Sequence, residues 1–284
     1  MARRPVVTDG AWGTELQKLG LAPGEHPDLW NLSHPDRVEE VAARYVEAGS
    51  DVILTNTFRS NRIALGTHAG EADVAALNAR GVEISRRAAG GRARVFASVG
   101  PSGRMLMAGE VTEEELTAAF TEQCHALADA GADAILIETM ADIDETRIAV
   151  KAARTTGLPV VASMVFDSGK EKDRTMMGAT PEQVAAALTE AGADVIGANC
   201  GLGIEGYIPV CGRLRRATHL PLWIKPNAGM PEMADGRITY RTSPEQFAAG
   251  ARELRKAGAD FIGGCCGTSP AFLRAVVAAL RGLD

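Results

Sequence analysis

Three of the five cysteines in this 284-residue chain, Cys200, Cys265 and Cys266, come directly after runs of small and β-branched residues. Zinc binds thiolate sulfur at about 2.3 Å in tetrahedral geometry, and three protein ligands leave one coordination position open. The glycines around the adjacent pair permit an irregular turn that would aim both of its sulfurs at one ion. If the three sulfurs converge, the pattern therefore predicts a catalytic zinc site rather than a structural one.

The chemistry of such a site follows from its ligands. A zinc ion held by three thiolates has a net negative formal charge, which makes it a weak Lewis acid toward carbonyls. It still lowers the pKa of a bound thiol and keeps that sulfur nucleophilic. Neutral histidine ligands would suit the activation of water better. The cysteines therefore indicate alkylation of a small thiol rather than hydrolysis.

The remaining thiols and glycines have simpler explanations. Cys124 and Cys211 fall inside predicted helices, where cysteine is an ordinary small apolar residue. An odd number of cysteines, two of them adjacent, is not a disulfide framework. The glycines around Cys265 also fit the phosphate-binding loop that is common late in barrel sheets, but this alternative leaves the adjacent cysteines unexplained.

Acidic and polar side chains follow other strand-like runs. Asp9 and Glu138 are the acids among them, and because a buried carboxylate without a partner is costly, each should meet a cation. The ammonium group of an amino-acid substrate would satisfy both. Glu138 is equally explained as a cap for the helix that starts at Asp142, or as the partner of a basic residue. Thr57 and Phe58 are expected to line the cavity.

Lys225 and Asn227 end another strand-like run. Asn227 is predicted to support the metal site or to serve as a temporary fourth ligand when substrate is absent. Lys225 supports a different class of function, a metal-free lyase or isomerase in which its amine forms a Schiff base. The neighbouring Pro226 and the lack of a nearby activating cation count against this alternative.

A recurring pattern marks the elements that must position these residues. Ala-Gly, then Ser or Ala, then Asp and an apolar run begins at residues 48, 130, 191 and 257. Each copy is typical of a helix that ends at a glycine and leads into a strand. Further strand-like runs lie at 5–8, 94–99, 159–166 and 220–225. Helical patterns lie at 35–48, 72–89, 112–130, 142–155, 181–191, 205–217, 243–257 and 270–280.

This alternation predicts an α/β fold, a single-domain (β/α)8 TIM barrel over residues 1–284. A doubly wound open sheet is the alternative, because alternation does not show closure. The pattern recurs on every second strand, which favours a barrel whose interior layers come from alternate strands. Active sites of such barrels lie at the carboxyl ends of the strands, where all the residues singled out above fall.

Composition restricts location and partners. A hydrophobic fraction of 46% is that of an ordinary soluble globular protein. A net charge of −6 argues against nucleic acid as the main partner, which requires a basic face. No apolar run approaches the ~18 residues of a membrane-spanning helix. The first residues lead straight into a strand without a signal peptide, so we expect a cytoplasmic protein.

Six motifs, in order, resemble those of the homocysteine S-methyltransferase family. They lie at residues 9–16, 55–61, 138–140, 197–201, 225–229 and 263–268. The resemblance covers essentially the whole chain, and the split cysteine pattern is its most specific part. It implies a homocysteine-binding, zinc-dependent TIM barrel that transfers a methyl group to the thiolate of homocysteine and makes methionine.

The resemblance also implies roles for individual residues. Cys200, Cys265 and Cys266 would be the zinc ligands. Asp9 and Glu138 would hold the substrate amino group, and backbone N–H groups near Gly10 would hold its carboxylate.

The methyl donor stays open at this stage. S-methylmethionine, S-adenosylmethionine, betaine, methylcobalamin and a methylated corrinoid protein are the candidates. We expect neither the folate and cobalamin domains of cobalamin-dependent methionine synthases nor the C-terminal arm of the betaine-using branch. Segments 27–32 and 225–227 look closer to the methionine-synthase type, whereas the length is similar to that of the S-methylmethionine-using enzymes. A different thiol acceptor, or a non-catalytic barrel that serves a corrinoid partner, are further alternatives.

Overall fold

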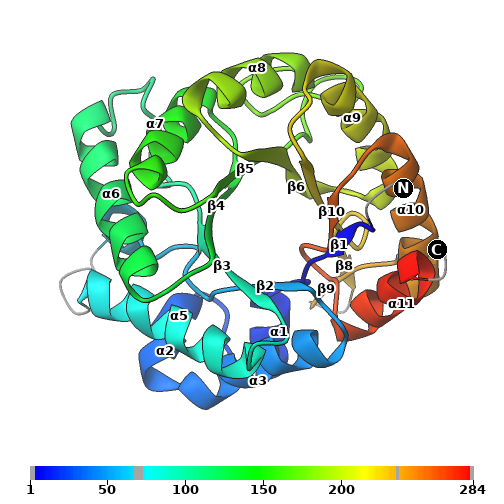
Figure 1. The fold of residues 1–284 in the computed structure, drawn as a ribbon, viewed down its shortest axis with the longest axis horizontal. Helices are drawn as coiled ribbons and strands as arrows, with labels where there is room; N and C mark the ends of the chain where they lie inside the picture. The colour runs from blue at the N-terminus through cyan, green and yellow to red at the C-terminus, as the bar shows by residue number, and fades with distance from the viewer. Residues whose placement is uncertain (1–3, 67–72, 235–236, 282–284) are drawn as a thin grey trace.

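The computed structural model describes residues 4–66, 73–234 and 237–281. Eight parallel strands form one sheet in the order β1-β10-β7-β6-β5-β4-β3-β2. A parallel bridge between Thr8 and Val52 joins the first and last strands of this order, so the sheet closes into a barrel. Helices surround the barrel on the outside (Figure 1). The predicted (β/α)8 architecture is confirmed, and the alternative of an open sheet is wrong.

The strands of the barrel are β1 (Val6–Val7), β2 (Val52–Leu54), β3 (Arg94–Val99), β4 (Ala134–Met140), β5 (Val160–Met164), β6 (Val195–Gly203), β7 (Leu222–Asn227) and β10 (Phe261–Ile262). The long outer helices are α3 (Pro35–Glu47), α5 (Val74–Ala89), α6 (Glu113–Asp129), α7 (Ile143–Arg154), α8 (Pro181–Ala191), α9 (Ile204–Ala217), α10 (Pro244–Ala257) and α11 (Pro270–Arg281). Each matches a predicted element to within a few residues. The predicted starting residue of α5, 72, and the predicted domain limits 1 and 284 lie outside the described residues.

Several short elements are absent from the sequence prediction. They are α1 (Gly13–Lys18), the 3₁₀ helix η1 (Pro27–Leu29), α2 (Trp30–Ser33), α4 (Arg62–Leu65) and a hairpin of β8 (Glu232–Ala234) and β9 (Arg237–Thr239). All lie in loops that follow β1, β2 or β7. One turn of helix or three residues of strand carries too little periodicity to stand out in a sequence.

The recurring Ala-Gly-x-Asp pattern has a structural explanation at both of its fixed positions. Its four glycines, Gly49, Gly131, Gly192 and Gly258, have φ angles of 92° to 108°, the left-handed conformation that ends a helix. Its four aspartates, Asp51, Asp133, Asp194 and Asp260, accept the backbone N–H of Val7, Val95, Val160 and Leu222 at 2.8–2.9 Å. Each aspartate thus ties the start of an even-numbered strand to the preceding strand of the barrel, which for β10 is β7.

Large side chains fill the inside of the barrel below its carboxyl end. Trp223 from β7 stacks on Phe96 at 5.9 Å between ring centroids and lies 5.5 Å from Phe261. Gly197 of β6 leaves room for this strand, since a Cβ atom there would lie 1.8 Å from the carbonyl oxygen of Trp223. The barrel is therefore a packed core with its functional surface above it, not an open pore.

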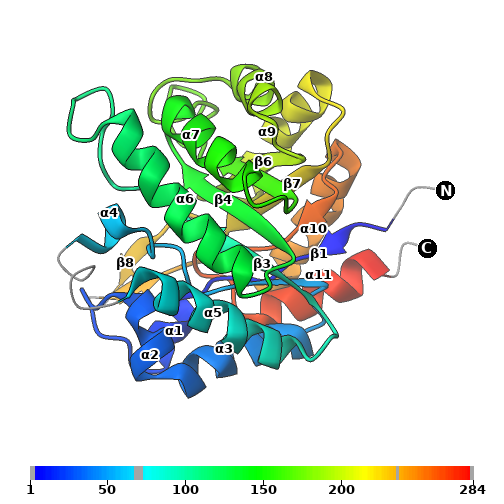
Figure 2. The same cartoon turned by 60° about the vertical axis from the view of Figure 1, so that its left-hand side comes forward.

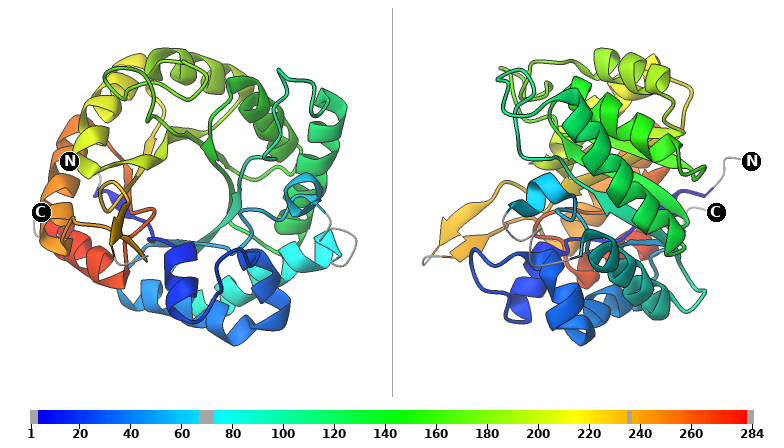
Figure 3. Two further views of the ribbon diagram at one scale, coloured as in Figure 1. Left: turned by 180° about the vertical axis from the view of Figure 1, so that it is seen from behind. Right: turned by 90° about the vertical axis from the view of Figure 1, so that its left-hand side faces the viewer.

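The two ends of the barrel differ. In Figure 2, the hairpin and α4 lie at one end, and the start of β1 and the end of α11 lie toward the other. The hairpin projects beyond the carboxyl ends of the strands, as the side view of Figure 3 shows. Among the described residues, no helix has the length and apolar character that crossing a membrane would need.

Candidate active site

Three cysteine sulfurs meet at the carboxyl end of the barrel. The Sγ atoms of Cys200, Cys265 and Cys266 all lie within 4.8 Å of one another, and those of Cys200 and Cys266 are 3.9 Å apart. Three sulfurs at about 2.3 Å from one tetrahedral zinc ion would be separated by about 3.8 Å. The three thiols therefore fit a single metal ion that keeps one further position for a ligand.

Irregular backbone aims these thiols at one point. Cys200 has a φ of 64° and Gly201 a φ of 60°, so β6 loses its regular register between Asn199 and Gly203. A residue other than glycine is strained in this conformation, and such strain often marks a functional site. On the other side, the amide of Cys265 donates to the carbonyl of Pro226 at 2.8 Å. This bond ties the turn that carries the cysteine pair to β7.

Hydrogen bonds within the cluster shift the pKa values of its thiols. Hydrogen bonds from Cys265 and Cys266 lower the pKa of Cys200 far below that of an ordinary thiol. The hydrogen bonds of Cys265 to Cys200 and Cys266 raise its own pKa, because they hold its proton. A metal ion would have to displace the protons of this cluster in order to bind.

Asn199 connects the thiol cluster to Glu138 of β4. Its amide nitrogen donates to Thr139 Oγ1 at 2.7 Å and to Glu138 Oε2 at 3.4 Å, and its amide oxygen accepts from the backbone of Thr139 and from Ser163 Oγ. Thr139 is a second non-glycine residue with positive φ, at 61°. One buried amide therefore holds the kinks of β4 and β6 together and orients both Glu138 and Cys200.

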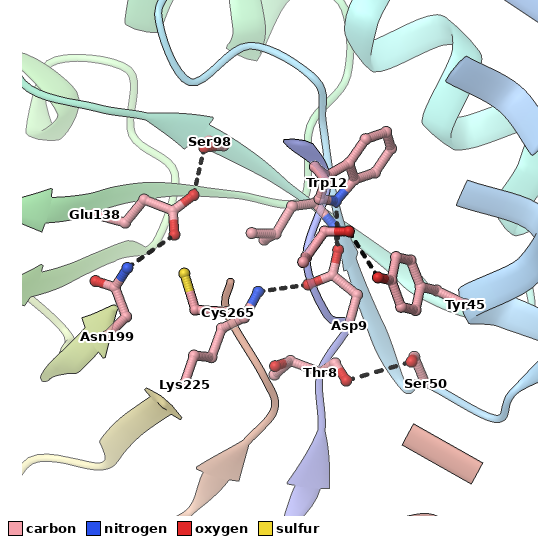
Figure 4. Close-up of polar contacts among 12 residues, drawn as sticks. Thr8, Asp9, Trp12, Tyr45, Ser50, Ser98, Glu138, Asn199, Lys225 and Cys265 are labelled. Carbon is pink, nitrogen blue, oxygen red and sulfur yellow. Dashed lines mark hydrogen bonds and ion pairs between the residues drawn. The ribbon is translucent and has the colours of Figure 1, made fainter. Parts of the chain in front are cut away.

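Glu138 is buried, 7% exposed, and faces into the barrel mouth (Figure 4). Its Oε1 accepts a hydrogen bond from Ser98 Oγ at 2.5 Å. Desolvation raises the pKa of this carboxyl group despite the attraction of Lys225. A cation bound beside Glu138 would reverse that shift, because an opposite charge favours the ionised form.

Asp9 lies across the mouth from Glu138 and is fully buried. Its Oδ1 accepts from Lys225 Nζ at 2.5 Å, and its Oδ2 accepts from Trp12 Nε1 and from the backbone N–H of Leu54, both at 2.8 Å. Attraction to Asp9 and Glu138 outweighs burial and raises the pKa of Lys225. The lysine is therefore a charged ammonium and not the neutral amine that Schiff-base chemistry needs.

Comparison with known sequences decides the family. A sequence model of the homocysteine S-methyltransferase family matches residues 6–280. The chain belongs to this family. The match spans all eight strands of the barrel and includes every residue of the thiol cluster.

Among relatives of this family member are two proteins named methionine synthase. The one from Mycobacterium tuberculosis is 32% identical over 305 residues, which cover 100% of this chain and 25% of the relative. The one from Mycobacterium leprae is 30% identical over 299 residues, which cover 99% of this chain and 24% of the relative. The chain thus spans about a quarter of the length of these two relatives.

Among solved structures, the family member homocysteine methyltransferase MmuM from Escherichia coli in its metallated form has a similar fold. It matches with a TM-score of 0.81 and 26% identity, over 98% of this chain and 96% of that one. The metallated state of that barrel agrees with a metal-binding role for the cysteine cluster of this family member.

The other residues that the sequence singled out lie around the same mouth of the barrel. Gly10 is tightly enclosed, because a Cβ atom there would lie 2.8 Å from the Tyr45 hydroxyl. Thr57 is fully buried and its Oγ1 donates to the carbonyl of Ser98 at 2.7 Å. Phe58 is half-buried against Gly100. Contact of substrate with Gly10, Thr57 or Phe58 stays a prediction.

Asn227 lies beside the cysteine cluster and is 4% exposed. Its side-chain nitrogen donates to the carbonyl of Gly201 at 3.1 Å, but its buried Oδ1 has no hydrogen-bond partner among the described residues. An oxygen left in this way fits the predicted roles of Asn227 near a metal ion. Glu138, by contrast, does not cap α7, because that helix is capped by the side chain of Asp142 itself.

Two residues of the site were not assigned a role from the sequence. Asn199 stands next to Cys200, but nothing in the sequence shows that its amide bridges two strands. Tyr240 follows the hairpin, and its ring fills the space beside Gly267, where a Cβ atom would lie 2.4 Å from it. Burial and the charge of the nearby cysteine cluster raise the pKa of Tyr240. The Asp235-Gly236 pair is the sequence signal for the hairpin that brings this residue to the site.

Proposed function

We propose that this chain is a zinc-dependent homocysteine S-methyltransferase that transfers a methyl group to the homocysteine thiol and forms methionine. The observation that carries the proposal is the convergence of three thiols within 4.8 Å beside the buried carboxylate of Glu138. Membership of the S-methyltransferase family supports the reaction class. The acceptor and the metal are inferred from the donor set and from the printed names of the relatives.

The protein residues divide into two groups. Cys200, Cys265 and Cys266 would hold the zinc ion, and Asn227 supports this site from β7. When bound, zinc supplies the positive charge that keeps a substrate thiol deprotonated and nucleophilic. Glu138 and Asp9 form the acidic region that would surround the α-ammonium group of the amino acid, and the backbone around Gly10 would lie on the carboxylate side.

The barrel contributes position rather than acid–base chemistry. Methyl transfer to sulfur needs the thiol and the methyl carbon about 3–3.5 Å apart and in line, and holding them there supplies much of the rate gain. Phe58 and Tyr240 are the half-buried rings that would exclude water from the mouth. The loops after β1 and β2, which carry α1, η1, α2 and α4, are the proposed lids.

A protein-borne methyl donor is a second candidate, favoured by the surface around the mouth. Six methionines that are 36–76% exposed lie in the loops that follow β3, β5 and β7: Met105, Met107, Met176, Met177, Met230 and Met233. Exposed methionines of this density are typical of adaptable protein-binding surfaces. The chain would then act with a methylcorrinoid protein, consistent with its match to about a quarter of each methionine synthase.

The remaining alternatives are weaker. A metal-free lyase would need a neutral Lys225, whereas that residue is ion-paired with Asp9. Nucleic acid does not suit a chain of net charge −6. We place the protein in the cytoplasm, since a reducing compartment keeps three neighbouring thiols available for a metal.

A donor panel with zinc analysis tests the proposal. Protein purified without chelator should contain about one equivalent of zinc, as expected for one cluster of three thiolates. With homocysteine as acceptor, the protein should make methionine from S-methylmethionine, S-adenosylmethionine, betaine or methylcobalamin. If it makes methionine only from a methylated corrinoid protein, the second candidate is the correct one. No turnover with any donor, in protein that contains zinc, would exclude homocysteine methylation.

A further inference from the structure

A buried ammonium group occupies a place that the proposed reaction does not use. The side chain of Lys225 is 2% exposed and that of its partner Asp9 is 0% exposed. Lys225 Nζ lies above the ring of Trp223, 5.7 Å from its centroid, inside the mouth of the barrel. Because an ammonium group is costly to remove from water, a buried lysine at this position needs a compensating partner.

Asp9 is satisfied by the protein itself. A carboxylate has about four acceptor positions, and three of those on Asp9 are taken by Lys225, by Trp12 and by the backbone of Leu54. The strongest of these partners is already a cation. A substrate ammonium would therefore find Asp9 neutralised and largely occupied.

Glu138 is in the opposite situation. Its two hydrogen bonds come from the neutral groups of Ser98 and Asn199, and the second is long at 3.4 Å. Within residues 4–66, 73–234 and 237–281, no basic side chain forms an ion pair with it. Lys225 attracts Glu138 from a distance, but its hydrogen bond goes to Asp9, as Figure 4 shows. Of the two acids, Glu138 is the one that lacks a cation.

We propose that Lys225 divides the roles of the two acids: it holds Asp9 in an internal ion pair and leaves Glu138 as the single acceptor of the substrate ammonium. The inference rests on the proposed function and deepens it. Lys225 is then a specificity-determining residue that sets the number of free carboxylates in the mouth to one. Asp9 is a positioning residue that fixes Lys225 and the start of the β1 loop.

Equilibrium binding separates the two acids. Zinc-loaded protein is titrated by calorimetry with homocysteine and with 4-mercaptobutanoate, the same thiol acid without the amino group. The ratio of the two affinities measures what the ammonium contributes, expected to be about 10- to 100-fold for a charge-assisted hydrogen bond. The titration is run at a pH of about 8, where carboxyl groups are ionised.

Three variants give distinct expectations for this ratio. Glu138→Gln should bring it close to one through weaker homocysteine binding, with 4-mercaptobutanoate unaffected. Lys225→Met should raise it, because Asp9 becomes a second free carboxylate. The double variant Asp9→Asn with Lys225→Met should return it to the wild-type value, because Glu138 is again the single charged acceptor.

The double variant still tests the inference if Lys225→Met alone fails to fold, since it removes both charges of the buried pair together. A double variant that loses the preference for homocysteine would show that Asp9 binds the ammonium and overturn the inference. An unchanged ratio in folded Lys225→Met would do the same. If wild-type protein binds neither thiol, the proposed function itself fails, which is a different outcome from a wrong pattern of ratios.

Discussion

The five cysteines offer a comparison within one chain. Cys124 and Cys211 are fully buried in helices, where desolvation raises the pKa of each thiol to about 12. Cys200, Cys265 and Cys266 lie in irregular turns at the mouth, with sulfurs close enough to share an ion. Residues of one type thus have opposite chemistry because the backbone places them differently.

Replacement of any one cluster cysteine by alanine should abolish both metal binding and activity, because two thiolates cannot hold zinc in place. Metal content after desalting, measured by atomic emission, checks this. Cys124→Ala and Cys211→Ala are matched controls that should keep about one equivalent of zinc. A Cys200→Ala protein that retains its metal would contradict the assignment of the cluster.

The pKa of Glu138 gives a second residue-scale prediction. Burial raises it, and only the ionised carboxylate attracts an ammonium group. The KM for homocysteine should therefore fall as the pH rises through this raised pKa. The step should be absent in Glu138→Gln, with kcat little changed. Steady-state kinetics with 4-mercaptobutanoate as acceptor provide the control, since a substrate without an amino group should show no such step.

At the scale of elements, the recurring aspartates test why the barrel strands stay in register. Asp133 accepts the N–H of Val95 at 2.8 Å and also forms an ion pair with Arg94, whose side chain is 75% exposed. An exposed ion pair contributes little, whereas an unpaired buried N–H is costly. Asp133→Ala should thus lower the free energy of unfolding by about 1–3 kcal/mol.

Urea denaturation measures this loss, and two variants isolate its cause. Asp133→Asn keeps an acceptor oxygen and should recover most of the stability. Arg94→Ala removes only the exposed partner and should cost at most about 1 kcal/mol. Equal losses in Asp133→Ala and Arg94→Ala would mean that the ion pair, and not the backbone hydrogen bond, holds the strands.

The same aspartates show what the sequence could and could not predict. Their spacing located four strands and, with the runs between them, the whole barrel. The hydrogen bonds that they make to neighbouring strands have no local signature, because both partners are distant in sequence. The hairpin that carries Tyr240 was missed for a related reason: its strands have three residues each, too few for a period of two to stand out.

At the scale of the whole molecule, the site was more predictable than its internal connections. Barrel closure alone brings Cys200 and the cysteine pair to either side of β7, so their convergence followed from the fold. The ion pair of Asp9 with Lys225 spans 216 residues, and the bridge from Asn199 to Glu138 spans 61. Sequence identified the acids but not their partners, since partner choice depends on side-chain directions inside the barrel.

The position of the metal site relative to the core leads to the last prediction. Among the residues that the structure describes, the buried apolar clusters around Trp223 and between strands and helices contain none of the three cysteines, which lie at the mouth. A metal held there stabilises the fold only by binding to it, by about 2.7 kcal/mol at a free concentration of a hundred times its Kd. For a chain of this size, that corresponds to a Tm shift of roughly 5 °C. Zinc-depleted protein should therefore keep its far-UV circular dichroism and melt cooperatively at a lower Tm.

Added zinc should restore the Tm in wild-type protein but not in Cys266→Ala. Unfolding upon chelation would instead make the cluster a structural site and remove the argument that its open position serves a substrate.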